Sequence, residues 1–127
     1  MALVRLAVNG TLMRGEKLHS HLEELGAKFI DEDKTMGCYR LFSINDEYPG
    51  MIHDESRFAG NIKIEIYEIE EEKLHLLMEQ EPKGLYLGKV VLQNGKLIYG
   101  ILAKEEFLRG QKDITKFGGW KKYLKNK

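Results

Sequence analysis

The sequence of 127 residues is poor in several features, and each shortage excludes a class of protein. Cys38 is the only cysteine, so no disulfide can form within the chain, which favours a reducing compartment and predicts a cytoplasmic location. Twenty basic and twenty acidic residues cancel, so no net charge attracts nucleic acid or a membrane surface. The apolar run at residues 3–8 is too short for a signal peptide or a membrane span.

Motifs that bind metals or carry nucleophiles are also scarce. No two of the four histidines have the spacing of four residues that a helical zinc site uses, and we therefore expect neither a metal nor another cofactor. The chain contains no Gly-x-Ser-x-Gly and no Walker sequence. Cys38 is a candidate nucleophile, but a free cysteine in an apparent strand is more often a packed structural residue. The four histidines of the chain are His19, His21, His53 and His75.

The length and the 43% hydrophobic content predict one globular domain, residues 1–127. Hydrophobic periodicity predicts helices at 16–25 and 70–78, with short helical turns at 105–109 and 120–124. Residues 45–60 show no clear period and are expected to form a long loop. The fold class is therefore α+β, with a mainly antiparallel and barrel-like sheet. Strands are predicted at 3–8, 27–30, 38–44, 62–66, 85–92 and 96–103, the last two joined by an Asn94-Gly95 hairpin turn.

The segment that starts near residue 62 has apolar residues at both even and odd positions. Ile62, Ile64 and Ile66 alternate with Lys63 and Glu65, which is typical of a strand buried on one face. Further along the chain, Tyr67 and Ile69 carry apolar side chains on the opposite face. We therefore expect either a bulge or burial of both faces in this segment.

The most informative segment is the strand at 3–8 followed at once by Asn9-Gly10-Thr11-Leu12 and a helix. Gly10 can adopt backbone angles that a side chain forbids. Such a turn can direct the backbone amides of residues 9–12 into a cavity, where they would hold a carboxylate or an oxyanion. The alternative is an ordinary strand–turn–helix connection without a ligand.

Near the middle of the chain, Leu76-Leu77-Met78-Glu79-Gln80-Glu81-Pro82 predicts the end of a helix, because proline disfavours the helical state of the residue before it. A carboxylate at this junction can point into a pocket, where burial would raise its pKa. Glu79 and Glu81 are otherwise ordinary surface acids.

The C-terminal segment contains the only tryptophan. Phe117, Trp120 and Tyr123 recur every three residues, which predicts one helical face packed on the core. Lys121, Lys122, Lys125 and Lys127 form either an anion-binding patch or a solvated tail.

These segments resemble a known family. The Asn9-Gly10-Thr11-Leu12 loop resembles the Tyr-Gly-Thr/Ser-Leu loop of the gamma-glutamylcyclotransferase-like superfamily. The tail from Asp113-Ile114 through Phe117-Gly118-Gly119-Trp120 to Tyr123-Leu124 looks like the end of the C-terminal domain of allophanate hydrolase, as do Tyr39-Arg40-Leu41, Pro49-Gly50 and Pro82 to Val90. The resemblance implies a small mixed barrel with helices around it.

The resemblance also implies functional residues. In the cyclotransferases the glycine loop binds the carboxylate end of the substrate, and a glutamate in a Leu-Asp-x-x-Glu-Gly pattern is the acid/base. This chain matches that pattern at Leu77 and Glu81 and departs from it at Met78, at Pro82 and at Asn9, which replaces the usual tyrosine.

We therefore expect weak or no gamma-glutamylcyclotransferase activity. The allophanate hydrolase domain implies instead a carbamate-like or dicarboxylate substrate, and a separately encoded amidase as a partner. A non-catalytic module that assembles with such an amidase is the alternative. The predicted catalytic residue is Glu81, and the predicted substrate contacts are Asn9, Gly10, Thr11, Leu12, Tyr86 and Arg40, the last either a bidentate carboxylate clamp or a surface residue.

Overall fold

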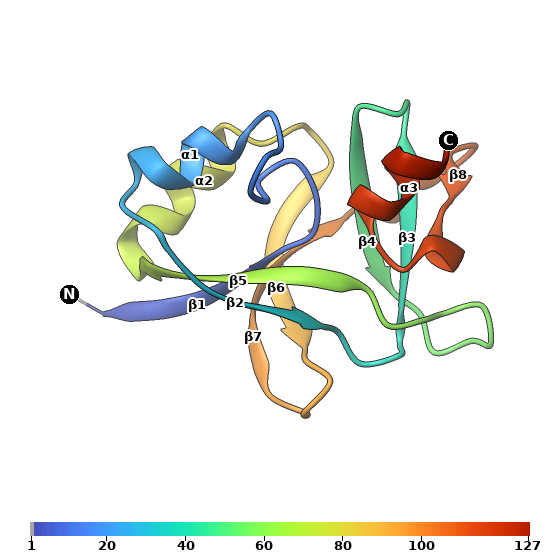
Figure 1. Ribbon diagram of the computed structural model, residues 1–127, viewed down its shortest axis with the longest axis horizontal. Helices are drawn as coiled ribbons and strands as arrows, with labels where there is room; N and C mark the ends of the chain where they lie inside the picture. The colour runs from blue at the N-terminus through green and yellow to red at the C-terminus, as the bar shows by residue number, and fades with distance from the viewer. Residues whose placement is uncertain (1) are drawn as a thin grey trace.

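The computed structural model describes residues 2–127 and contains two β-sheets with short helices around them (Figure 1). The α-helices are α1 (His19–Glu24), α2 (Leu74–Glu79) and α3 (Trp120–Asn126). Three short 3-10 helices are η1 (Glu71–Lys73), η2 (Glu105–Leu108) and η3 (Thr115–Phe117). The strands are β1 (Leu3–Val8), β2 (Lys28–Lys34), β3 (Tyr39–Ile44), β4 (Tyr48–His53), β5 (Lys63–Glu70), β6 (Leu85–Val91), β7 (Leu97–Ala103) and β8 (Lys112–Asp113).

The larger sheet has the strand order β2-β5-β1-β7-β6, and the smaller sheet has the order β4-β3-β8. Strand β1 lies at the centre of the larger sheet, antiparallel to β5 and parallel to β7. The remaining strand pairs are antiparallel. The mixed, mainly antiparallel α+β architecture predicted from the sequence is therefore confirmed.

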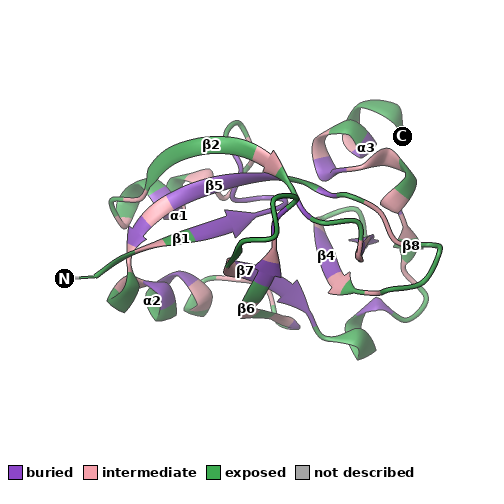
Figure 2. Ribbon diagram, turned by 90° about the horizontal axis from the view of Figure 1, so that it is seen from below, coloured by how far each residue is buried: buried purple, intermediate pink, exposed green. Residues whose placement is uncertain are grey.

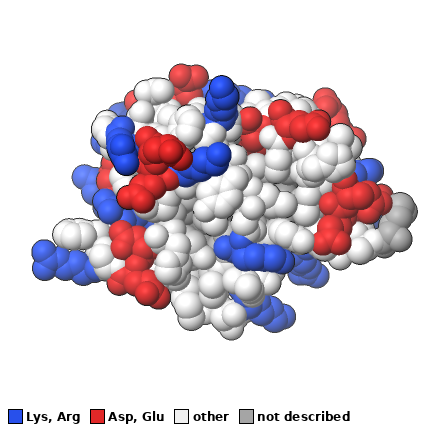
Figure 3. All heavy atoms as spheres, turned by 180° about the vertical axis from the view of Figure 1, so that it is seen from behind, with Lys and Arg blue, Asp and Glu red and all other residues white. Residues whose placement is uncertain are grey.

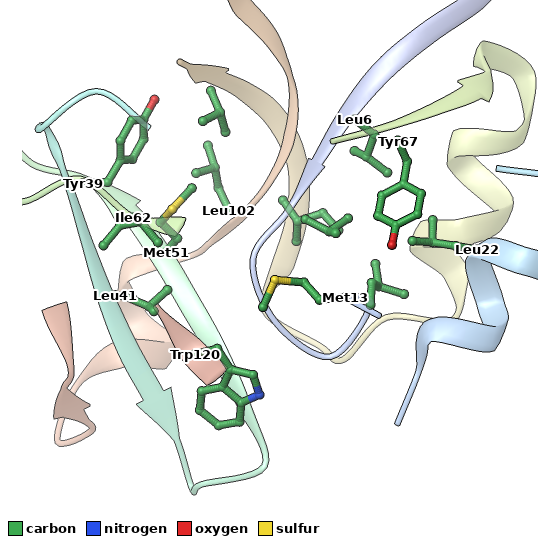
Figure 4. Packing of buried hydrophobic residues seen from close by; sticks show 14 of the residues in the cluster. Leu6, Met13, Leu22, Tyr39, Leu41, Met51, Ile62, Tyr67, Leu102 and Trp120 are labelled. Atoms are coloured by element: carbon green, nitrogen blue, oxygen red, sulfur yellow. The ribbon is translucent and has the colours of Figure 1, made fainter. Parts of the chain in front are cut away.

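Strand β5 is covered on both faces, as Figure 2 shows by its mostly buried colouring beside the exposed edge strand β2. Ile64 and Ile66 pack with Ala7 on one side. Tyr67 and Ile69 belong to the main core on the other side, part of which Figure 4 shows. Both faces of this segment are buried, and β5 pairs with β1 in an unbroken register, while a bulge in β2 between Phe29 and Asp31 shifts its pairing with β5.

The expected loop at residues 45–60 is wrong, because it contains strand β4, which pairs with β3 along its whole length. The turn between the two strands carries Asn45 and Asp46, both with positive φ angles of 53° and 58°. Asparagine and aspartate tolerate this left-handed conformation better than other side chains do, and they form tight hairpin turns. This turn chemistry was the signal for the hairpin.

Other element boundaries also shift. Helix α1 is shorter than the predicted 16–25, and β2 extends past the predicted 27–30 as the exposed edge of the larger sheet. An edge strand needs little apolar periodicity, because most of its side chains face solvent. None of the helices within residues 2–127 is long and apolar enough to cross a membrane.

Candidate functional site

A small pocket lies where β1 ends, between the Gly10 turn, the end of α2 and the start of β4. Its volume is about 10 Å³, which is room for about one water molecule. The pocket brings together segments that are far apart in the sequence. Its lining consists of Val8, Asn9, Gly10, Thr11, Leu12, Tyr48, Pro49, Glu81, Leu85 and Ile101.

Glu81 is the only ionisable carboxylate in this lining, and it follows the C-terminus of α2 directly. Its backbone N–H donates to the carbonyl of Met78 at 3.2 Å, which continues the last helical turn. Its Oε2 atom is buried and has no hydrogen-bond partner among residues 2–127. Burial raises the pKa of Glu81 to about 7, because the charged form loses its hydration. Glu79, two residues earlier, is exposed to solvent.

The Gly10 turn holds its carbonyl groups in place and leaves its amides without partners. The N–H of Met13 donates to the Gly10 carbonyl at 2.9 Å, and the Nδ1 atom of His19 lies 2.9 Å from the Leu12 carbonyl. Since a carbonyl only accepts, that ring nitrogen carries the proton. Within residues 2–127, no acceptor bonds the N–H groups of residues 10–12. The turn therefore supplies buried donors beside the Glu81 pocket.

Glycine is required at position 10 for space. Gly10 does not have a positive φ, so the expectation of unusual backbone angles is wrong. A Cβ atom at this position would instead overlap the ring of Pro49 on β4. The close approach of these two residues forms one wall of the pocket and joins the two sheets at this point.

Two lining residues, Tyr48 and Pro49, were missed because they lie in the segment predicted as loop. Burial, together with the nearby charge of Glu47, raises the pKa of Tyr48, so its phenol stays neutral. The Asn45-Asp46 turn could have placed both residues at the start of a strand.

Of the other predicted substrate contacts, Asn9 lines the pocket and Arg40 and Tyr86 do not. Asn9 lines the pocket, but its side-chain amide donates to the Ile101 carbonyl at 3.0 Å and thereby ties the turn to β7. The structure does not bring Arg40 to the pocket, because its guanidinium binds Asp113 at 2.6 Å and Asp54 at 3.2 Å. Tyr86 lies on an exposed hollow beside α2 rather than in this pocket.

Cys38 and the four histidines are not among the residues that line the pocket. Cys38 packs against the main core, and burial, with the nearby charge of Glu55, raises the pKa of its thiol, which disfavours the reactive thiolate. The described residues include no cluster of three or more His, Cys, Asp or Glu side chains placed to hold a metal ion.

A second hollow is much larger, at about 550 Å³, and lies between β5 and α3. Size alone would favour it as the functional site. The small pocket is the better candidate for chemistry, because it holds a carboxylate without a partner next to unpaired amide donors.

Similarity to known proteins is strong along nearly the whole chain. A urea amidolyase of Saccharomyces cerevisiae is 29% identical over 127 residues, which cover 95% of this chain and 7% of that protein. A putative gamma-glutamylcyclotransferase of Pyrococcus horikoshii is 39% identical over 94 residues, 73% of each chain. Its solved structure superposes with a TM-score of 0.75 over 97% of this chain and 94% of that one.

A third relative is similar over its entire length. The crystal structure of a uropathogenic Escherichia coli-specific protein superposes with a TM-score of 0.95 and 39% identity, covering 100% of this chain and 99% of that chain. The family model of the allophanate hydrolase C-terminal domain matches residues 4–125. The chain thus belongs to the allophanate hydrolase C-terminal domain family, with a fold of the gamma-glutamylcyclotransferase-like kind.

Proposed function

We propose that this protein is an enzyme that binds a small carboxylate-bearing amide or carbamate-like metabolite in the pocket beside Gly10, with Glu81 as the acid/base. One observation carries the proposal: a buried carboxylate without a hydrogen-bond partner faces a pocket lined by the turn whose amides also lack partners. Such an arrangement costs free energy in the empty protein. A ligand that accepts from the amides and exchanges a proton with the carboxylate would offset that cost.

The chemistry follows from the charges. The amides of residues 10–12 bind either the carboxylate of the substrate or the oxyanion that develops at its carbonyl carbon. Glu81, with a pKa of about 7, is a mixture of acid and base at neutral pH. It takes a proton from the attacking amine or water and returns it to the nitrogen that leaves. No further group is needed to supply or accept a proton.

Substrate entry requires the pocket to widen, since its volume of about 10 Å³ holds about one water molecule. The wall formed by Tyr48 and Pro49 is the element whose movement would admit a ligand. These residues follow directly after the β3–β4 turn, at the end of the hairpin.

Related proteins suggest the context of the reaction. The chain spans 7% of the length of the urea amidolyases it resembles. An amidase, separately encoded, is the partner we propose. Cys38 is unpaired and half-buried, which supports a reducing, cytoplasmic setting.

The decisive experiment is a paired assay. One arm supplies gamma-glutamyl dipeptides, and the other supplies allophanate together with a separate amidase. Each arm compares the wild type, Glu81→Gln and the matched control Glu79→Gln, which alters an exposed acid at the end of the same helix. We expect faster ammonia release in the amidase arm, lost in Glu81→Gln and kept in Glu79→Gln. No effect in either arm would favour a non-catalytic assembly module.

A second candidate is gamma-glutamylcyclotransferase activity, because a putative enzyme of that name is 39% identical over 73% of this chain. Asn9 and Pro82 replace residues typical of those enzymes, so we expect weak turnover. Robust turnover of gamma-glutamyl dipeptides that disappears in Glu81→Gln would reverse this preference and keep Glu81 as the acid/base.

A further inference from the structure

The larger hollow, named here the lysine cleft, lies between the start of β5 and α3 and is separate from the Glu81 pocket. Six lysines and two glutamates line it, which leaves an excess of four positive charges. The lysines are Lys34, Lys63, Lys116, Lys121, Lys122 and Lys125, and the glutamates are Glu32 and Glu65. The protein as a whole has no net charge, so this local excess is a property of the cleft. In contrast to the cleft, the face of the molecule in Figure 3 carries both basic and acidic side chains.

Both acids of the cleft are already neutralised by cations. Glu32 lies 3.7 Å from Lys63 and from Arg14, and Glu65 lies 3.4 Å from Lys121 and from Arg14. Within residues 2–127, the other four lysines have no acidic group within 4 Å. Their charges are available to a ligand.

One further donor lies buried beneath the floor of the cleft. Trp120 is 2% exposed, and its Nε1 atom is buried without a hydrogen-bond partner among residues 2–127. Trp120 and Met13 both line the cleft, and Figure 4 shows the indole nitrogen on the edge of the ring toward the Met13 side. An indole N–H is only a donor, so its missing partner must be an acceptor.

The walls of the cleft are held in a fixed position. The N–H of Lys63 donates to the Gly118 carbonyl at 2.7 Å, which joins β5 to the segment before α3. A Cβ atom at Gly119 would come within 3.2 Å of the Lys63 side chain, so a larger residue here would have to displace that side chain by a few tenths of an ångström. The backbone on both sides of the cleft is therefore held together, and the lysine side chains extend from it.

We propose that the lysine cleft binds a small organic oxyanion with at least two negative charges, of the phosphate or the carboxylate type. One oxygen accepts from the Trp120 indole, and the remaining charge faces Lys34, Lys122 and Lys125. A volume of about 550 Å³ suits a metabolite, and the apolar floor formed with Phe117 suits its carbon portion. The site is independent of the Glu81 chemistry.

The test uses inorganic pyrophosphate and citrate as probes, one for each oxyanion type. Calorimetry measures affinity, and the fluorescence of Trp120, the only tryptophan, reports binding at the cleft. We expect saturable binding with a fluorescence change. Lys122→Gln combined with Lys125→Gln should weaken it about tenfold, since each surface charge pair contributes a few-fold. The matched control is Lys104→Gln, an exposed lysine outside the cleft.

Two measurements keep the proposal falsifiable if a variant is unstable. In the unaltered protein labelled with ¹⁵N, the indole N–H resonance should shift on titration, and Trp120→Phe should weaken binding about tenfold through loss of a charged hydrogen bond. An indole resonance that does not move, or equal losses in the lysine pair and in Lys104→Gln, would overturn the proposal. If a poly-glutamate peptide binds while neither pyrophosphate nor citrate does, the proposal is overturned in favour of an acidic protein partner.

Discussion

At the scale of single residues, Glu81 makes the stability of the fold depend on pH. Its pKa is raised from 4.5 to about 7, so the folded state binds more protons than the unfolded state between these values. Stability is therefore lost as pH rises from about 4.5 through 7. The loss is at most about 3.5 kcal/mol, at about 1.4 kcal/mol per unit for a shift from 4.5 to about 7.

We expect Glu81→Gln to remove this pH dependence of the free energy of unfolding. Relative to the wild type, the variant should gain stability steadily between pH 5 and pH 8, as measured by urea unfolding at each pH. Glu79→Gln serves as the control, since Glu79 is exposed. A constant difference between the wild type and Glu81→Gln across this range would contradict burial of the carboxylate.

The contact between Gly10 and Pro49 allows a direct test of pocket geometry. Gly10→Ala places a Cβ atom against the Pro49 ring and should cost about 1–3 kcal/mol of unfolding free energy by overpacking. Pro49→Ala should be mildly destabilising alone, and the double variant should recover most of the loss from Gly10→Ala. Additive losses in this double-mutant cycle would show that the two residues do not meet.

Glu65 shows where a residue pattern fails. Alternation along β5 predicts an exposed acid, whereas Glu65 is 2% exposed. Burial opposes its charge, but the N–H of Arg14 and the hydroxyl of Tyr67, each at 2.9 Å, hold the pKa of this carboxylate below its usual value. Periodicity records which positions are apolar, and it carries no information on partners supplied by a distant turn.

Replacement of Glu65 should therefore be costly. Glu65→Ala leaves the Tyr67 hydroxyl and the Arg14 amide without an acceptor, and we expect a loss of about 2–3 kcal/mol in urea unfolding. Glu68→Ala, on the same strand but only half-buried, should change stability much less. Equal effects of the two substitutions would refute a buried structural carboxylate at position 65.

At the scale of elements, the β3–β4 hairpin carries the part of the pocket that the sequence did not predict. Asn45 has a positive φ of 53°, which a β-branched side chain resists. Asn45→Val should cost about 1–2 kcal/mol, while Asn45→Gly should be neutral or stabilising. Thermal unfolding compares the two variants. A stable Asn45→Val protein would mean that the turn adopts another conformation.

The other wall of the pocket was predictable because its signals are local. The Gly10 turn follows a short apolar strand, and Glu81 precedes a proline that ends α2. Tyr48 and Pro49 reach the pocket through the pairing of β3 with β4, which depends on contacts between residues distant from Gly10 in sequence. Arg40 was predicted as a substrate contact, but it binds Asp54 and Asp113, which come from two other segments and which local patterns could not reveal. Local patterns located most of the elements but not β4, and tertiary pairing decided which side chains meet.

At the scale of the whole molecule, the two hollows share one connection. Leu12 lines the Glu81 pocket, and the next residue, Met13, lines the lysine cleft. A ligand in either site stabilises the folded state by mass action, by about 2.7 kcal/mol at a concentration one hundred times its dissociation constant. Thermal unfolding with each class of ligand can therefore separate the sites.

We expect succinate, a small dicarboxylate, to raise the unfolding temperature of the wild type but not of Gly10→Ala, in which the pocket wall is displaced. Pyrophosphate should raise the unfolding temperature of both proteins, and should lose this effect in the Lys122→Gln Lys125→Gln variant, because these lysines line only the cleft. Added salt should weaken the pyrophosphate effect more, since exposed charges are screened while a buried pocket is screened less. Succinate stabilisation that survives Gly10→Ala but is lost with the two lysines would assign both anions to the cleft and leave the Glu81 pocket without a ligand.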